Sequence, residues 1–274
     1  MKKLHFYSIG LLFLSLISCS KEDIVVDREL VNAYAEIEFS NEVDFNSGIE
    51  AASDNSSFSD RTSNNSNSVL TSCATVTVDN ATPGVFPKTF TIDFGTGCIS
   101  NGIMRSGIIT VTISDYIMNT GSVTTIVRGN NYYINSRKVE GTIVYQNTTT
   151  DVNTPQWNRT VTNGKTTTTA GDVFTHSGTR TVKQIAGVST LALLDNIYEI
   201  TTGNHSITKN GNSTLTATVV QPLIKKYACP HVSQGQLDLQ ANVIDGILDY
   251  GDNTCDYFAT YTHSNGVVYN IVLN

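Results

Sequence analysis

Thr89-Phe90-Thr91-Ile92-Asp93-Phe94 alternates polar and apolar side chains, which is the pattern of a strand with one buried face. The same period of two recurs in Cys73–Val78, Ile109–Ile113 and Leu215–Val219. Threonine on one face and a branched aliphatic or aromatic residue on the other suit a half-buried strand. No stretch after Ser68 sustains a helical stripe of useful length, so the sequence predicts an all-β fold.

Turn dipeptides separate these runs: Asn101-Gly102, Asn163-Gly164, Asn210-Gly211, Asp245-Gly246 and Asn265-Gly266. Such pairs favour two-residue hairpin turns, because both central residues of a type I′ turn need a positive φ. Short connections make neighbouring strands antiparallel. We therefore expect residues 69–274 to form one antiparallel meander of hairpins. Three arrangements stay open: a curved open sheet, a sandwich and a half-barrel.

Residues 1–18 have the order of a secretory signal peptide, with Lys2 and Lys3 followed by an apolar run from Ile9 to Ile17. The run is too short to cross a bilayer, which takes about 20 residues as a helix. Leu16-Ile17-Ser18-Cys19 resembles the lipobox of bacterial lipoproteins. This resemblance implies that Cys19 is acylated, with palmitate among its chains, and binds the membrane as the mature N-terminus. A signal peptide cut elsewhere is the alternative.

The acidic motif after Cys19 concerns localisation. Lys21-Glu22-Asp23 resembles the export signal of Bacteroidota surface lipoproteins, which implies display on the outer membrane; the alternative is the start of a solvated linker. Removal of residues 1–18 leaves 256 residues and, because Lys2 and Lys3 are lost, moves the net charge from -7 to -9. Nucleic acid is an unsuitable partner for this charge, because phosphate binding needs clustered Lys and Arg.

Residues 19–68 are predicted to be a lipidated, flexible tether. From Ala51 to Ser68 the composition is almost wholly Ser, Asn and Asp, with little apolar area to offset the entropy of ordering. Two sets of apolar residues have helical spacing and predict one or two short helices within the tether: Leu30, Tyr34 and Ile37, and then Phe45, Ile49 and Ala52.

The cysteines predict two disulfides. The chain has five cysteines, and acylation of Cys19 leaves an even number. Ile92–Cys98 parallels Leu248–Cys255, and each of these cysteines follows an earlier one by 25 or 26 residues. We expect the pairs Cys73–Cys98 and Cys229–Cys255, one of three connectivities. A four-cysteine metal site is disfavoured, because close Cys-x-x-Cys spacing is absent.

The body of the chain resembles an uncharacterised group of Bacteroidota surface lipoproteins. The resemblance runs from about Val69 to the C-terminus and is carried by Cys73–Asp79, Lys88–Gly95, Leu248–Asp252 and Cys255-Asp256. Arg105–Ile109 and Asn131–Asn135 fit the same pattern. This resemblance implies a surface location and a β-architecture, but it carries no catalytic residues.

One loop carries candidate metal ligands: Asp249, Asp252, Asn253 and Asp256. Oxygen ligands at a tight turn suit Ca²⁺, which is the one cofactor that the sequence suggests. Asp and Asn also occupy such turns by capping their own backbone, and this is the competing interpretation.

Aromatic residues provide a second candidate site: Tyr116, Tyr132, Tyr133, Tyr145 and Trp157. Exposed on a curved sheet, they would stack on a glycan or lie in a protein interface. The competing interpretation places them in the core or in cross-strand pairs. Because Tyr132 and Tyr133 are adjacent on a strand, we expect at most one of them in the core.

Catalytic motifs of the Gly-x-Ser-x-Gly, His-Glu-x-x-His and Walker types do not occur. His176, His205, His231 and His263 are scattered, and we expect them to be polar surface residues. The prediction is therefore a non-catalytic, lipid-anchored surface module that binds an unknown glycan or protein. The alternative is a surface hydrolase acting on glycan or peptide without a recognisable motif.

Overall fold

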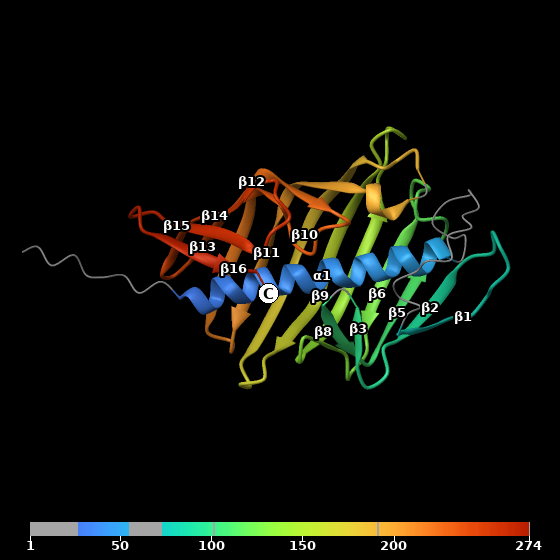
Figure 1. Ribbon diagram of the computed structural model, residues 1–274, viewed down its shortest axis with the longest axis horizontal. Helices are drawn as coiled ribbons and strands as arrows, with labels where there is room; N and C mark the ends of the chain where they lie inside the picture. Colours follow the sequence, from blue (N-terminus) through green and yellow to red (C-terminus); the bar gives the residue numbers. More distant parts are fainter. Residues whose placement is uncertain (1–26, 55–72, 101, 191, 274) are drawn as a thin grey trace, which may run out of the picture.

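The computed structural model describes residues 27–54, 73–100, 102–190 and 192–273. The predicted signal peptide, Cys19 and Lys21–Asp23 lie outside these ranges. Within them the strands form one 16-stranded antiparallel sheet, and the order along the sheet has β1 at one edge and β16 at the other. The all-β prediction is confirmed, in the form of an open sheet (Figure 1).

Thirteen strands follow the main path β1-β2-β5-β6-β8-β9-β10-β11-β12-β13-β14-β15-β16, while β3, β4 and β7 branch from β8. Their bounds are β1 Thr75–Val78, β2 Lys88–Asp93, β3 Cys98–Ser100, β4 Ile103–Ser106, β5 Ile108–Ile113, β6 Val123–Arg128, β7 Tyr133–Ile134, β8 Arg137–Asn147, β9 Gln156–Thr167, β10 Val173–Ala186, β11 Ile197–Lys209, β12 Ser213–Lys226, β13 Gln234–Ala241, β14 Ile244–Asp252, β15 Phe258–His263 and β16 Val268–Val272. A short 3₁₀ helix, Leu193–Asp195, precedes β11.

The one α-helix among the described residues, α1 (Arg28–Asp54), lies across one face of the sheet (Figure 1). Asp27 caps its first turn, because the Asp27 carboxylate accepts a hydrogen bond from the Leu30 amide. All six residues with helical spacing lie in this helix and are buried. The prediction of a flexible tether with short helices is therefore wrong for residues 28–54, which belong to the folded body. The prediction from composition was wrong because the polar side chains of α1, which suggest solvent exposure, bind residues of the sheet.

The core lies between α1 and the sheet. Inward-facing residues such as Phe90 and Val111 are fully buried there, as are Leu30 and Tyr34 of the helix. At Gly48 the helix packs directly on the sheet, because an added Cβ would lie 3.3 Å from Val111 Cγ1. The helix is buried along most of its length and is therefore the inner layer of the protein.

Two of the five predicted hairpin turns are wrong. Asn163-Gly164 lies inside β9, where Asn163 has a φ of 52° and the pairing with β8 shifts opposite Gly141. The positive φ thus serves a β-bulge instead of a turn. Asp245-Gly246 lies inside β14, and a Cβ at Gly246 would come 2.2 Å from the Thr262 carbonyl oxygen. Glycine is needed there because the neighbouring strand approaches closely.

The other turn predictions and the disulfides are confirmed. Asn210-Gly211 and Asn265-Gly266 connect β11 to β12 and β15 to β16, and Gly102 lies between β3 and β4. The cysteine pairs are Cys73–Cys98 and Cys229–Cys255, each with a Cα–Cα distance of 5.4 Å. The first disulfide ties the start of β1 to β3, and the second ties the segments that follow β12 and β14.

Candidate functional site

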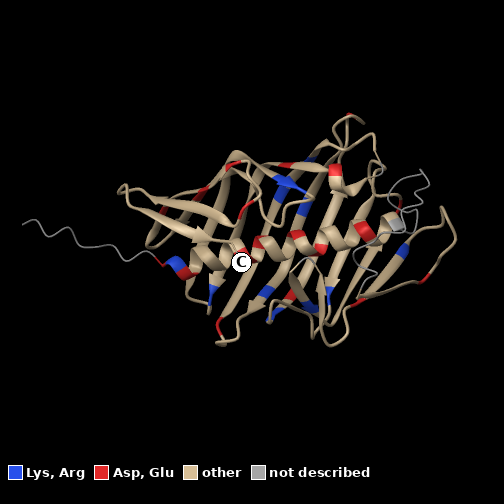
Figure 2. Ribbon diagram, in the orientation of Figure 1, with Lys and Arg blue, Asp and Glu red and all other residues tan. Residues whose placement is uncertain are grey.

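Charges are segregated between the two layers of the core. Among the described residues, every buried carboxylate belongs to α1, whereas every buried lysine or arginine belongs to a strand. Figure 2 shows acidic positions distributed along the ribbon of α1 and basic positions on the strands around it. The buried carboxylates are Glu38, Glu42 and Asp44, and the buried cations are Lys88, Arg105, Arg128, Arg159, Arg180 and Lys225.

Arg128, on β6, binds the polar side of α1. Its Nε lies 2.7 Å from Asp44 Oδ2, and both side chains are completely buried. Its Nη2 donates to Asn41 Oδ1 at 2.9 Å. Tyr132 donates its hydroxyl to the other oxygen of Asp44, so the carboxylate is bound on both sides.

Arg159, on β9, binds two carboxylates of the helix. Its Nη2 lies 2.7 Å from Glu38 and its Nη1 lies 2.9 Å from Glu42. Burial disfavours the charge on Glu38, but Arg159 and His205 outweigh burial and hold the pKa of Glu38 well below its usual value. For Glu42, burial outweighs the attraction of Arg159 and raises the pKa. Arg159 therefore holds Glu38 as its ionised partner.

Two histidines join this cluster. His205 Nδ1 lies 2.9 Å from Glu38 Oε1, and His205 Nε2 lies 3.1 Å from His176 Nδ1. The rings stack with their centroids 5.2 Å apart. Burial lowers the pKa of both histidines, so both rings are neutral near pH 7. Their prediction as surface residues is wrong, because β10 and β11 place both on the inner face of the sheet.

Glycine makes room for these rings. A Cβ at Gly164 would lie 2.3 Å from His176 Cε1, and one at Gly178 would lie 2.9 Å from His205 Cβ. Asn163-Gly164 therefore forms a bulge and not a turn, and this bulge leaves space for the buried ring of His176. His231 is also buried, against Phe39 of α1, and His263 is buried beside Tyr261.

Arg180, on β10, completes the row of bound cations. It donates to the hydroxyl of Tyr34 at 2.6 Å and to the backbone carbonyls of Gly203 and Ala217. Lys88 and Lys225 also donate to backbone carbonyl oxygens, each to two of them. Arg180, Lys88 and Lys225 thus donate to uncharged oxygen atoms of the protein.

Arg105, on β4, differs from these cations. Its Nη1 donates to the Ser47 hydroxyl, and its guanidinium lies over the ring of Phe94 at 4.1 Å. Its Nε is buried without an acceptor, as are Arg159 Nε, Arg180 Nε and Arg128 Nη1. What sets Arg105 apart is that it has one hydrogen-bond acceptor among the described residues, whereas each of the other three arginines has two or three. Arg105 is also the one side chain that lines both of the larger pockets described among these residues.

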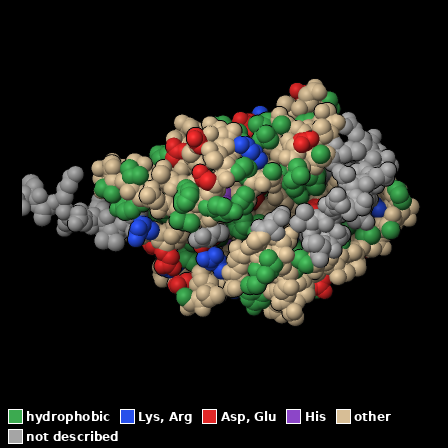
Figure 3. Space-filling model, viewed as in Figure 1, with side chains coloured by type: hydrophobic (Ala, Val, Ile, Leu, Met, Phe, Trp, Pro, Cys, Tyr) green, Lys and Arg blue, Asp and Glu red, His purple; other side chains and the backbone are tan. Residues whose placement is uncertain are grey.

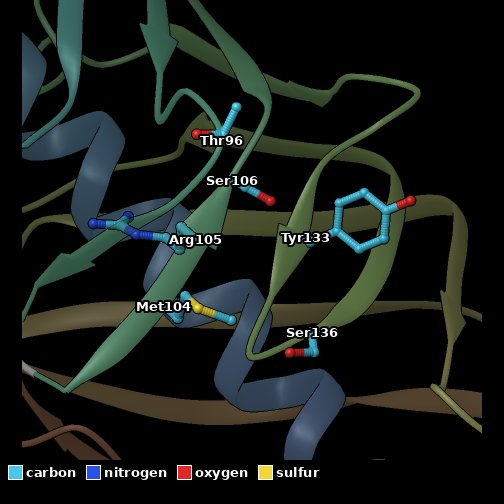
Figure 4. Close-up of a pocket in the computed structure, with 6 residues that line it drawn as sticks. All are labelled: Thr96, Met104, Arg105, Ser106, Tyr133 and Ser136. Carbon is cyan, nitrogen blue, oxygen red and sulfur yellow. The ribbon is translucent and has the colours of Figure 1, made fainter.

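The smaller of the two pockets, about 310 Å³, lies between β4 and β7. Figure 4 shows Arg105 pointing from β4 towards α1, away from Tyr133, while Ser106 points to the other side of the strand. The larger pocket, about 370 Å³, is walled by α1 residues such as Phe39 and Val43 and by Ile103 of β4. The guanidinium on the α1 side of β4 therefore belongs with the larger pocket.

The candidate calcium ligands do not converge. Asp249 accepts hydrogen bonds from the Gly251 amide and from Gln236, while Asp252 accepts from Thr254. Asn253 accepts from Ser233, and Asp256 accepts from the Phe258 amide. No cluster of three or more His, Cys, Asp or Glu side chains suited to a metal occurs in the described part of the chain. The capping interpretation fits these contacts, and calcium binding stays an untested prediction.

The aromatic residues do not form an exposed platform. Tyr132, Tyr145 and Trp157 are buried, and Tyr145 stacks on Phe45 of α1 with centroids 4.2 Å apart. Tyr116 and Tyr133 are half-buried. The prediction that at most one of Tyr132 and Tyr133 is core is confirmed, whereas a stacking surface built from all five residues is wrong.

Comparison with known proteins gave no match to a family model, to a curated protein or to a solved structure. Within the described ranges, no helix is both long and apolar enough to span a membrane. Function is therefore argued from the geometry of the chain itself.

Proposed function

We propose that the protein is a lipid-anchored module of the outer-membrane surface that binds a glycan or protein ligand and performs no catalysis. The observation that carries the proposal is the burial of Glu38, His205 and His176. These residues could move protons, yet the side chains of His205 and Glu38 are only 0% and 8% exposed. They contact each other and Arg159 between α1 and the sheet, so their roles are structural.

The proposed anchor would lie close to the folded body. Eight residues, 20–27, separate Cys19 from the first residue of α1, and they span at most about 30 Å when extended. A lipid on Cys19 would hold the sheet close to the membrane surface. The module would then meet ligands that reach the outer membrane itself.

Fractionation of cells tests the anchor. Cys19→Ser should move the protein from the membrane fraction to the soluble fraction, because the acylated thiol is lost. The matched control replaces Lys21, Glu22 and Asp23 with alanine; this variant should stay in the membrane fraction but become inaccessible to protease added to intact cells. Retention of Cys19→Ser in the membrane would contradict the proposal.

A ligand array distinguishes binding from hydrolysis. The mature chain carrying Cys19→Ser is applied to immobilised glycans and extracellular proteins, and the array is then examined for cleavage products by mass spectrometry. We expect retained protein and intact ligands. Cleavage that disappears in a folded His205→Gln variant would instead establish the hydrolase.

A further inference from the structure

Arg105 is a buried cation with incomplete partners. Its side chain is on the inner side of β4, and the residue is 6% exposed. The fully buried arginines Arg128 and Arg159 are ion-paired with Asp44 and with Glu38 and Glu42, whereas no ion pair among the described residues includes Arg105. Within the same ranges, its hydrogen-bond acceptor is the hydroxyl of Ser47.

The guanidinium of Arg105 therefore has N–H groups that could donate to a ligand. A buried charge is costly unless it is paired and hydrogen-bonded. The ring of Phe94 offsets part of the cost through a cation–π contact, but Nε still has no acceptor. A carboxylate matches the guanidinium better than any neutral acceptor, because two parallel N–H groups can donate to its two oxygens.

The adjacent pocket has room for the rest of such a ligand. Its volume of about 370 Å³ falls within the range of small-molecule sites, roughly 300–1,000 Å³. Phe39, Val43 and Ile103 provide apolar walls. Leu194 and Tyr257, which also line it, are 70% and 55% exposed, so the pocket opens to solvent between them.

We propose that this pocket binds a carboxylate with an apolar body, its carboxylate on Arg105 and its body along Phe39, Val43 and Ile103. This proposal does not rest on the proposed binding of a glycan or protein. A negative ligand array therefore leaves it intact, and its own failure leaves the proposed function intact.

Calorimetry with small probes tests the site. The mature chain carrying Cys19→Ser avoids detergent, and it is titrated with octanoate, 1-octanol and acetate. We expect octanoate to bind one to one and at least about tenfold more tightly than 1-octanol, because a buried charge pair contributes that much or more. Acetate, which lacks the apolar body, should bind far more weakly. Equal affinities for octanoate and 1-octanol would overturn the proposal.

Two variants assign the effect to charge. Arg105→Met should reduce the affinity for octanoate to that for 1-octanol. The unliganded Arg105→Met protein should melt no lower than the parent, since it loses an incompletely bound charge. An unchanged preference for octanoate, or a lower melting temperature with the preference retained, would show a purely structural role. If Arg105→Met does not fold, Arg105→Lys should retain part of the preference.

Discussion

Two regions of the contact between α1 and the sheet contain the same types of residue but differ in their partners. In the middle of the helix, Arg128 and Arg159 are each bound by carboxylates at 2.7–2.9 Å. Near its C-terminal end, Arg105 is bound by the Ser47 hydroxyl and the Phe94 ring. Burial is similar in both regions, so the difference lies in charge compensation. The first region fixes the helix on the sheet, and the second retains capacity for a ligand.

The largest expected effect comes from breaking the compensated region. Arg159→Met should lower the free energy of unfolding by about 3–5 kcal/mol, because it leaves the buried Glu38 and Glu42 without their cation. Urea denaturation of the parent and the variant measures this loss. A loss below about 1 kcal/mol would mean that Arg159 contributes little to holding α1.

A matched control separates the charge from its position. Replacement of the whole group, Glu38→Leu with Glu42→Leu and Arg159→Met, should restore most of the stability lost in Arg159→Met. Well-packed apolar residues often replace a buried ion cluster at no net cost. If the triple variant is less stable than Arg159→Met alone, the carboxylates have further essential partners, with His205 the first to test.

Acidification should weaken the same region. The pKa values of His176 and His205 are lowered in the folded state, so below about pH 6.5 the unfolded chain binds protons that the folded chain does not. The free energy of unfolding should therefore fall as the pH falls below 6.5, by at most about 1.4 kcal/mol per pH unit for each histidine. Thermal melting between pH 7.5 and pH 5 measures it.

The glutamates act mainly at lower pH. Stability that Glu38 provides through its lowered pKa is lost only as the pH falls below about 4.5, its unfolded value. Glu42, whose pKa is raised, acts in the opposite direction: its contribution is present below about 4.5 and is lost as the pH rises through its folded pKa. His176→Asn serves as the control, because it should reduce the slope of melting temperature against pH between pH 6.5 and pH 5; the lowered pKa values of His205 and His231 account for the slope that remains. An unchanged slope in this variant would contradict the assignment.

The uncompensated region should respond less to the same substitution. Arg105→Met should leave the free energy of unfolding unchanged or raise it by up to about 1 kcal/mol. The reason is that this substitution removes a buried charge without leaving a buried carboxylate unpaired. Urea denaturation alongside Arg159→Met gives the direct comparison. A loss as large as that of Arg159→Met would show that Arg105 is compensated after all.

The smallest effect is expected at the edge of the interface. Arg137 lies 2.6 Å from Glu36, and both side chains are partly exposed. Arg137→Ala should cost about 0.5 kcal/mol or less, because solvent and salt screen such a pair. Melting at low and high salt measures this cost, which should disappear at high salt. A large, salt-independent loss would place this pair with the buried group.

Local patterns predicted much of the sheet and little of the site. The alternation around Phe90 and the turn at Asn210-Gly211 depend on neighbours in the chain, and both are confirmed. Asn163-Gly164 shows the limit of such patterns, since a positive φ suits a turn and a bulge equally well. Here the bulge forms, and the ring of His176 on the adjacent strand occupies the space beside Gly164.

The sequence by itself determined that the chain is β-rich, where four of its strands lie (β1, β2, β5 and part of β12) and how its four paired cysteines combine. The strands follow from a period of two, and the cysteine pairs follow from two similar spacings of 25 and 26 residues. Tertiary structure alone decided that residues 28–54 become the buried inner layer. Glu38, Glu42 and Asp44 are polar in isolation and predict solvent exposure; burial becomes favourable only when strands 84 to 121 residues away supply Arg128 and Arg159. No local sequence pattern predicts that the carboxylates of α1 match the arginines of the strands, because these residues become neighbours only in the folded chain.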